Sequence, residues 1–169
     1  HVLDFSMIES GNIVLNSYSF SLGELVAELR ADFELQATKK GLQFRLELDD
    51  SLPDEIVADR VRLRQILFNL LSNAVKYTES GEVKFIVAQA ADGIRFGVRD
   101  SGVGIPAEIQ SEVLKPYVQA SSPVRGRGIG LGLPISDQLI TLMGGALHLE
   151  SNFEGSLFEF TLCFTGAST

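Results

Sequence analysis

Residues 65–77 read QILFNLLSNAVKY, an apolar run that two asparagines interrupt. At about 100° of rotation per helical residue, the polar members of the run fall within roughly 80° of one another. These members are Gln65, Asn69, Asn73 and Lys76. Most of the other positions are apolar and would face a core. The stretch therefore predicts a largely buried helix that carries a single polar stripe.

The asparagines on this stripe admit two interpretations. Asparagine is a mediocre helix former because its side chain competes for backbone hydrogen bonds. A buried carboxamide without a partner costs about 1–3 kcal/mol, so one interpretation is that Asn69 and Asn73 bond to neighbouring backbone. Because Lys76 shares the stripe, a bound anion or metal ion is the competing interpretation.

The composition limits the classes of function. The chain has 169 residues, the length of one domain, and its 45% of apolar residues can supply a sizeable core. A formal net charge of −8 argues against a surface for nucleic acid or anionic membrane. The single cysteine, Cys163, permits no internal disulfide. No apolar run approaches the roughly 18 residues of a membrane span, and no signal peptide is recognisable.

Helices and strands are interleaved along the chain, and most of the strands pair as hairpins. Periodicity and caps predict helices over residues 1–10, 22–40, 59–78, 107–114 and 133–143. Alternation predicts strands over residues 12–20, 42–48, 83–90, 94–99, 146–151 and 156–164. Ser21 and Glu24 have the spacing of a capping box at the start of the second helix. This inventory predicts an α/β protein built as a layered sandwich.

The first glycine-rich segment, DSGVGIP at residues 100–106, follows a predicted strand. An aspartate at a strand end can point a carboxylate into a cleft, while the glycines behind it let the backbone approach a flat ligand. The alternative is an ordinary Asp-Ser-Gly turn. The segment alone does not decide between a site and a turn.

The second glycine-rich segment, GRGIGLGLP at residues 126–134, leads into a predicted helix. Alternate glycines before a helix N-terminus leave backbone N–H groups free to hold phosphate oxygens. The segment is not a Walker loop, because no Gly-Lys-Ser/Thr follows. The alternative is a flexible surface loop whose Arg125 and Arg127 are solvated charges.

Taken together, these segments resemble the catalytic ATP-binding domain of sensor histidine kinases, in the superfamily of the gyrase, mismatch-repair and chaperone ATPases. Residues 59–83 resemble the N box of that family, DSGVGIP its first glycine box and GIGLGLPIS its second. The resemblance implies the Bergerat fold, a two-layer α/β sandwich with a mixed, mostly antiparallel sheet. LDFSMIESGNIVL resembles the tail of the dimerisation helix of hybrid kinases. We therefore expect residues 1–11 to be that tail and residues 12–169 to be the catalytic domain.

The resemblance also implies a site for ATP and Mg²⁺. Asn73 would ligate Mg²⁺ through its carboxamide oxygen, Asn69 would support the same pocket, and Lys76 would contact phosphate. Tyr77 would flank the adenine, and Asp100 would accept a hydrogen bond from its exocyclic amine. The other positions that match the nucleotide site are Gly102, Gly104, Ile105, Tyr117, Arg125, Gly128, Gly130, Leu131, Gly132 and Leu133.

Several positions depart from the family pattern, and most of them lie in the lid before the second glycine box. The usual Phe–Pro–Phe-like motif reads Leu114-Lys-Pro-Tyr117, and the lid is about two residues short from Gln119 onward. Ser121 replaces an aspartate, and Ile129 replaces a threonine. The departures concern lid closure and turnover more than binding.

The chain has two histidines, His1 and His148, and neither lies in an acceptor motif. The resemblance thus implies that no catalytic acceptor lies in this chain and that the phosphorylated histidine is on an upstream dimerisation domain. It also implies a response-regulator receiver domain as partner, a homodimeric parent protein, and no contact with nucleic acid or membrane. The domain would be the cytoplasmic portion of a membrane-bound bacterial sensor kinase.

Two other functions compete with this kinase interpretation. A hydrolytic ATPase of the gyrase or chaperone kind needs a glutamate as general base one turn before the Mg²⁺ asparagine, where this chain has Asn69. A non-catalytic kinase domain with a degenerate lid would instead regulate a partner kinase by protein contacts. The upstream sequence discriminates the second rival, because only a kinase needs an intact acceptor motif there.

Overall fold

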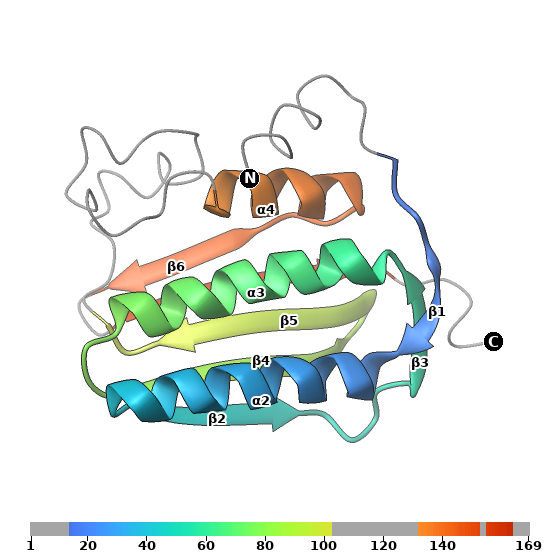
Figure 1. Cartoon of the computed structure of the whole chain (residues 1–169). Coiled ribbons are helices and arrows are strands. Elements are labelled where there is room, and N and C mark those ends of the chain that lie inside the picture. Colours follow the sequence, from blue (N-terminus) through green and yellow to red (C-terminus); the bar gives the residue numbers. More distant parts are fainter. Residues whose placement is uncertain (1–13, 103–131, 153–154, 164–169) are drawn as a thin grey trace.

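The computed structural model describes residues 14–102, 132–152 and 155–163, and this part of the chain forms a two-layer α/β sandwich. Figure 1 shows three helices lying across one face of a five-stranded sheet. The helices are α2 (Leu22–Lys40), α3 (Arg60–Tyr77) and α4 (Gly132–Leu142). The predicted fold class is confirmed, while the helices expected at residues 1–10 and 107–114 lie outside the described residues.

The main sheet is mixed, with strand order β2-β4-β5-β7-β6. Its strands are β2 (Gln43–Leu48), β4 (Glu82–Ala90), β5 (Gly93–Asp100), β6 (His148–Asn152) and β7 (Gly155–Leu162). Only the β2–β4 pair is parallel, and the other three pairs are antiparallel. In this register Asp100, the last residue of β5, lies between Val83 of β4 and Ser156 of β7. The central strand thus delivers a carboxylate to one end of the sheet.

A second sheet pairs β1 (Tyr18–Ser21) with β3 (Glu55–Ala58). The strand predicted over residues 12–20 was too long, because residues 14–17 are not in a strand. Strand β3 was not predicted at all. Each strand has only four residues, which is too few for an alternating pattern to be recognised.

The core lies between the helices and the main sheet. Phe85, Phe96 and Phe160 come from three neighbouring strands and are fully buried. The last two stack with ring centroids 5.2 Å apart. Fully burying one such side chain contributes about 1.5–3 kcal/mol. This packing fixes the strands from which the site residues project.

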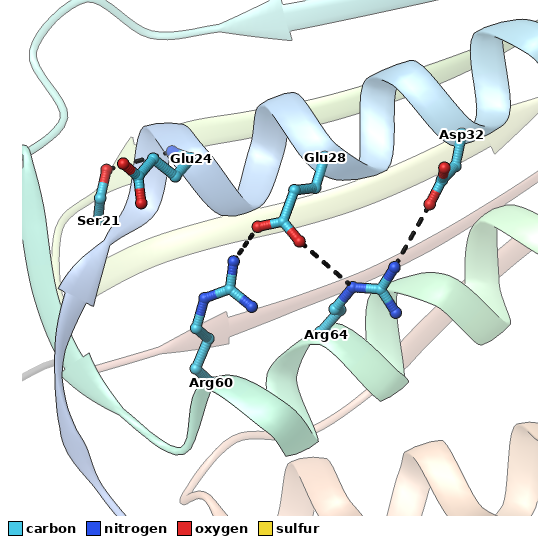
Figure 2. A network of polar contacts seen from close by, with 6 residues as sticks. All are labelled: Ser21, Glu24, Glu28, Asp32, Arg60 and Arg64. Carbon is cyan, nitrogen blue, oxygen red and sulfur yellow. Dashed lines mark hydrogen bonds and ion pairs between the residues drawn. The ribbon is translucent and has the colours of Figure 1, made fainter.

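Helices α2 and α3 are joined by apolar packing and by ion pairs. Arg60 and Arg64 of α3 reach Glu28 and Asp32 of α2, and the Arg64 Nη2–Asp32 Oδ2 distance is 3.3 Å (Figure 2). Exposed ion pairs contribute about 0–1 kcal/mol each, so these contacts align the helices more than they stabilise them. Among the described helices, none combines the length and apolarity that crossing a membrane requires.

Candidate functional site

Helix α3 positions the polar stripe as the sequence predicted. The buried Asp59 carboxylate starts the helix, because its Oδ1 accepts from the backbone N–H of Arg62 at 3.1 Å. Its Oδ2 accepts from the backbone N–H of Asn16 at 2.9 Å, which fixes the preceding chain as well. The apolar side of α3 is buried, whereas Asn69 and Asn73 are half-buried. The asparagines therefore lie at the edge of the core, beside solvent.

The two asparagines have different surroundings. Asn69 Nδ2 donates to Oγ of Ser136 at 3.3 Å, and Ser136 is fully buried in α4. This bond joins α3 to the helix that follows the second glycine-rich segment. Asn73 Nδ2 is also buried, but it has no hydrogen-bond partner within the described part of the chain. Of the two residues, Asn73 is the one that a ligand would satisfy.

The C-terminal end of α3 is held by a lysine from α2. Lys40 Nζ donates to the carbonyl oxygen of Val75 at 2.7 Å and to that of Lys76 at 2.8 Å. These carbonyls belong to the last turn of the helix, where they have no partner within the helix itself. The exposed Lys76 and half-buried Tyr77 therefore project from a fixed helix end.

Asp100 is a buried carboxylate, only 8% exposed, at the end of β5. Its Oδ1 accepts from the backbone N–H of Gly102 at 2.9 Å, and the backbone N–H of Ser156 also bonds to the carboxylate. Burial raises the pKa of Asp100 above its ordinary value of 3.8, although these bonds and the charge of Arg99 act in the opposite direction. A further hydrogen bond would stabilise the charged form of such a desolvated carboxylate.

Gly102 brings the first glycine-rich segment against the end of α3. A Cβ at this position would lie 2.8 Å from the carbonyl oxygen of Tyr77, 3.1 Å from Asp100 Oδ1 and 3.4 Å from Thr78 Oγ1. Only glycine therefore fits without a backbone shift. The Gly102 N–H bond to Asp100 shows a local turn over residues 100–102, and the burial of the carboxylate makes Asp100 a candidate site residue as well.

The remaining predicted site residues are only partly described. Leu133 is buried in the first turn of α4, where its side chain belongs to the core. Gly132 is the first residue of that helix. Seven predicted positions lie outside the described residues: Gly104, Ile105, Tyr117, Arg125, Gly128, Gly130 and Leu131.

Sequence reasoning missed two residues of this site, Thr78 and Ser156. Thr78 is fully buried, ends α3 and lies next to Gly102. Its position directly after Tyr77 was the available signal. Ser156 is buried opposite Asp100 in the β5–β7 register, and a pairing register across 56 residues of sequence cannot be read from the sequence.

The described residues fit a metal only as a partner of phosphate. They contain no group of three or more His, Cys, Asp or Glu side chains that could hold an ion. Mg²⁺ is commonly held by one or two protein oxygens together with waters and substrate phosphates. The carboxamide oxygen of Asn73 is a suitable single ligand. Its buried Nδ2, which has no partner within the described residues, is a donor and would need an acceptor such as a phosphate oxygen.

Comparisons with known proteins identify the family of this chain. A family model described as "Histidine kinase-, DNA gyrase B-, and HSP90-like ATPase" matches residues 58–166. The signal transduction histidine-protein kinase BarA of Escherichia coli K12 is 36% identical over 168 residues, which are 94% of this chain and 18% of BarA. The chain thus spans about a fifth of the length of that relative.

Solved structures are similar across nearly the whole chain. Full-length ShkA in complex with AMPPNP matches with a TM-score of 0.85 at 32% identity, covering 96% of this chain and 34% of ShkA. Histidine kinase ThkA in complex with the response regulator TrrA matches with a TM-score of 0.76 at 26% identity, covering 99% and 48%. The chain belongs to the histidine kinase-, DNA gyrase B- and HSP90-like ATPase family, as a catalytic ATP-binding domain of the two-component sensor histidine kinase type.

Proposed function

We propose that this chain binds Mg²⁺-ATP and delivers the γ-phosphate to a histidine on an upstream dimerisation domain of the same protein. Residues 1–11 would be the tail of the dimerisation helix, and residues 12–169 the catalytic domain. One observation carries the proposal: Gly102 brings the buried Asp100 carboxylate and the end of the asparagine helix to one point. A nucleotide site needs these two segments together.

The base would be recognised at this point. The Asp100 carboxylate would accept from the exocyclic amine of adenine, and Tyr77 would flank the ring. Gly102, Gly104 and Ile105 would leave room for the base. Guanine presents a carbonyl oxygen where adenine presents the amine, so a carboxylate acceptor disfavours it.

The phosphates would lie between α3 and the start of α4. Lys76 would supply charge, and the backbone N–H groups of Gly128, Gly130 and Gly132 would bind phosphate oxygens at the positive end of the helix dipole. Tyr117, Arg125, Leu131 and Leu133 would complete the surroundings. Asn73 would hold Mg²⁺, which would supply positive charge against the phosphates.

Asn69 favours transfer of the γ-phosphate to a histidine over hydrolysis of ATP by water. An amide cannot take a proton from water as a general base, and Asn69 is bonded to Ser136. The acceptor and the remaining partners would belong to the parent protein: its own dimerisation domain, a second copy in a homodimer, and a response-regulator receiver domain. ThkA, which was crystallised with a response regulator, supports the last partner. The parent would be a membrane-bound bacterial sensor kinase with this domain in the cytoplasm.

Labelling with γ-labelled ATP tests the proposal. We expect label on the full-length protein, loss of that label in its Asn73→Ala variant, and neither labelling nor appreciable hydrolysis by residues 1–169 alone. Nucleotide binding without labelling of the full-length protein would favour a regulator that acts on a partner kinase. Robust ATP hydrolysis by residues 1–169 that Asn73→Ala abolishes would contradict the argument from Asn69.

A further inference from the structure

The hydroxyl of Thr78 is a buried polar group at the end of α3. Thr78 ends α3 and is 0% exposed. Its backbone N–H bonds to the Ala74 carbonyl oxygen at 3.2 Å, but its Oγ1 has no hydrogen-bond partner within the described part of the chain. A buried hydroxyl in that condition costs about 1–3 kcal/mol. A group of this kind requires either a structural explanation or a partner that arrives with function.

The carboxylate of Asp100 lies in the same corner as the Thr78 hydroxyl. Thr78 Oγ1 and Asp100 Oδ1 lie 3.4 Å and 3.1 Å from one common point, the Cβ position that Gly102 leaves empty. Both residues are buried, so water competes little for either group. A hydroxyl donor and a carboxylate acceptor therefore lie close to one buried point without being bonded to each other.

We propose that Thr78 is a positioning residue whose hydroxyl donates to the Asp100 carboxylate when that carboxylate binds the adenine amine. The proposal rests on the proposed function, because it needs adenine at Asp100. A hydrogen bond to an ionised acceptor is about twice as strong as a neutral one. The bond would fix the orientation of the carboxylate and favour its charged form, which is the form that accepts from the amine.

Other charged and polar groups also surround Asp100. On its own strand Arg99 is the neighbouring charge, and it already acts on the carboxylate. Helix α3 ends with Lys76 and Tyr77. Strand β4 contributes Glu82, whose backbone N–H donates to Oγ of Ser101 and whose carboxylate pairs with Arg45. Among the described residues of β7, the one opposite Asp100 is the uncharged Ser156. Of the two hydroxyls in this set that lie beside Asp100, only that of Thr78 lacks a bond, since Ser156 Oγ is bonded to Ser151.

The test measures the affinity of residues 1–169 for Mg-ADP as a function of pH. Thr78→Val keeps the shape but removes the hydroxyl, and we expect about tenfold weaker binding at pH 7. The pH below which affinity is lost should also move upward by about one unit. Thr78→Ser keeps the hydroxyl and should bind within about twofold of the parent chain. Thr78→Ala provides a second variant without the hydroxyl should the valine disturb folding.

A double-mutant cycle with Asp100→Asn separates positioning from packing. If Thr78 acts through the carboxylate, Thr78→Val should change affinity less than twofold in the Asp100→Asn background. Without nucleotide, the melting temperature of Thr78→Val should be no lower than that of the parent chain, because the substitution removes a hydroxyl that has no partner within the described residues. An unchanged affinity and pH profile of Thr78→Val, or an equal loss in both backgrounds, would overturn the inference alone. Absence of any Mg-ADP binding by the parent chain would overturn the proposed function and this inference with it.

Discussion

At the scale of single residues, the Asp100 carboxylate lowers the folding stability of the free domain and provides a charged acceptor for the proposed ligand. Burial raises its pKa above 3.8, so its contribution to folding is fully favourable below that ordinary value and is lost as the pH rises through the raised one. At neutral pH the ionised carboxylate therefore destabilises the free domain. A residue that lowers the stability of the free chain but offers a charged acceptor is typical of a binding site.

The substitution Asp100→Asn tests this exchange. It removes the buried charge and keeps an oxygen that can accept from the Gly102 N–H, so we expect a free domain at least as stable as the parent at pH 7. The new amide donor opposes the adenine amine, so Mg-ADP should bind at least about tenfold more weakly. Urea unfolding and calorimetric titration measure the two effects. Asp50→Asn, at an exposed position, is the control and should change neither; unaltered ADP affinity in Asp100→Asn would leave Asp100 as a turn residue only.

The two asparagines of α3 provide a matched pair. Asn73→Ala removes the carboxamide oxygen proposed to hold Mg²⁺, so it should abolish the Mg²⁺ dependence of triphosphate binding. Little stability should be lost, because Asn73 Nδ2 has no partner within the described residues. Asn69→Ala breaks the bond to Ser136 and should lower the free energy of unfolding by about 1 kcal/mol. Titration of ATP with and without Mg²⁺ checks the first effect. Equal losses of adenosine and Mg-ATP binding in Asn73→Ala would show that Asn73 supports the fold instead.

At the scale of elements, Lys40 makes the end of α3 dependent on α2. Lys40→Met keeps much of the aliphatic stem but loses the two bonds to α3 carbonyls. We expect the free energy of unfolding to fall by about 1–2 kcal/mol and Mg-ADP to bind more weakly, because the helix end that carries Lys76 and Tyr77 is loosened. Lys39→Met removes the neighbouring charge of the same turn and is the control. If both variants behave alike, only the charge at the end of α2 matters.

Long elements with caps could be predicted from the sequence, and short or non-local ones could not. The start of α2 was predicted from Ser21 and Glu24, and the structure shows Ser21 Oγ accepting from the Glu24 N–H at 3.2 Å. The predicted end of this helix at residue 40 is confirmed, and Gly41, which caps it with a φ of 82°, explains why the helix ends there. Strand β3 and the parallel pairing of β2 with β4 depend on contacts between distant segments. Ser156 could not be predicted for the same reason, because its place beside Asp100 is a consequence of strand register.

At the scale of the whole molecule, the residues that stabilise the fold and those proposed to bind the ligand lie in different places. The phenylalanine core between the helices and the sheet holds the domain together, while one end of β5 and the end of α3 converge on a polar corner. This convergence is consistent with a shared site for Asp100 and the asparagine helix, which stays a prediction, and the sequence could not place Thr78 beside it. The phosphate-binding positions upstream of Gly132 remain predictions from the family pattern.

The most direct measurement is a titration of residues 1–169 with Mg-ADP, followed by calorimetry and by thermal unfolding. We predict saturable binding of Mg-ADP, weaker binding of Mg-GDP, and a stability increase of roughly 2.7 kcal/mol at about 100 times the Kd. The increase should fall sharply in Asp100→Asn. If millimolar Mg-ADP gives no heat and no shift in the melting temperature, the polar corner at Asp100 is not a nucleotide site and the proposed function is wrong.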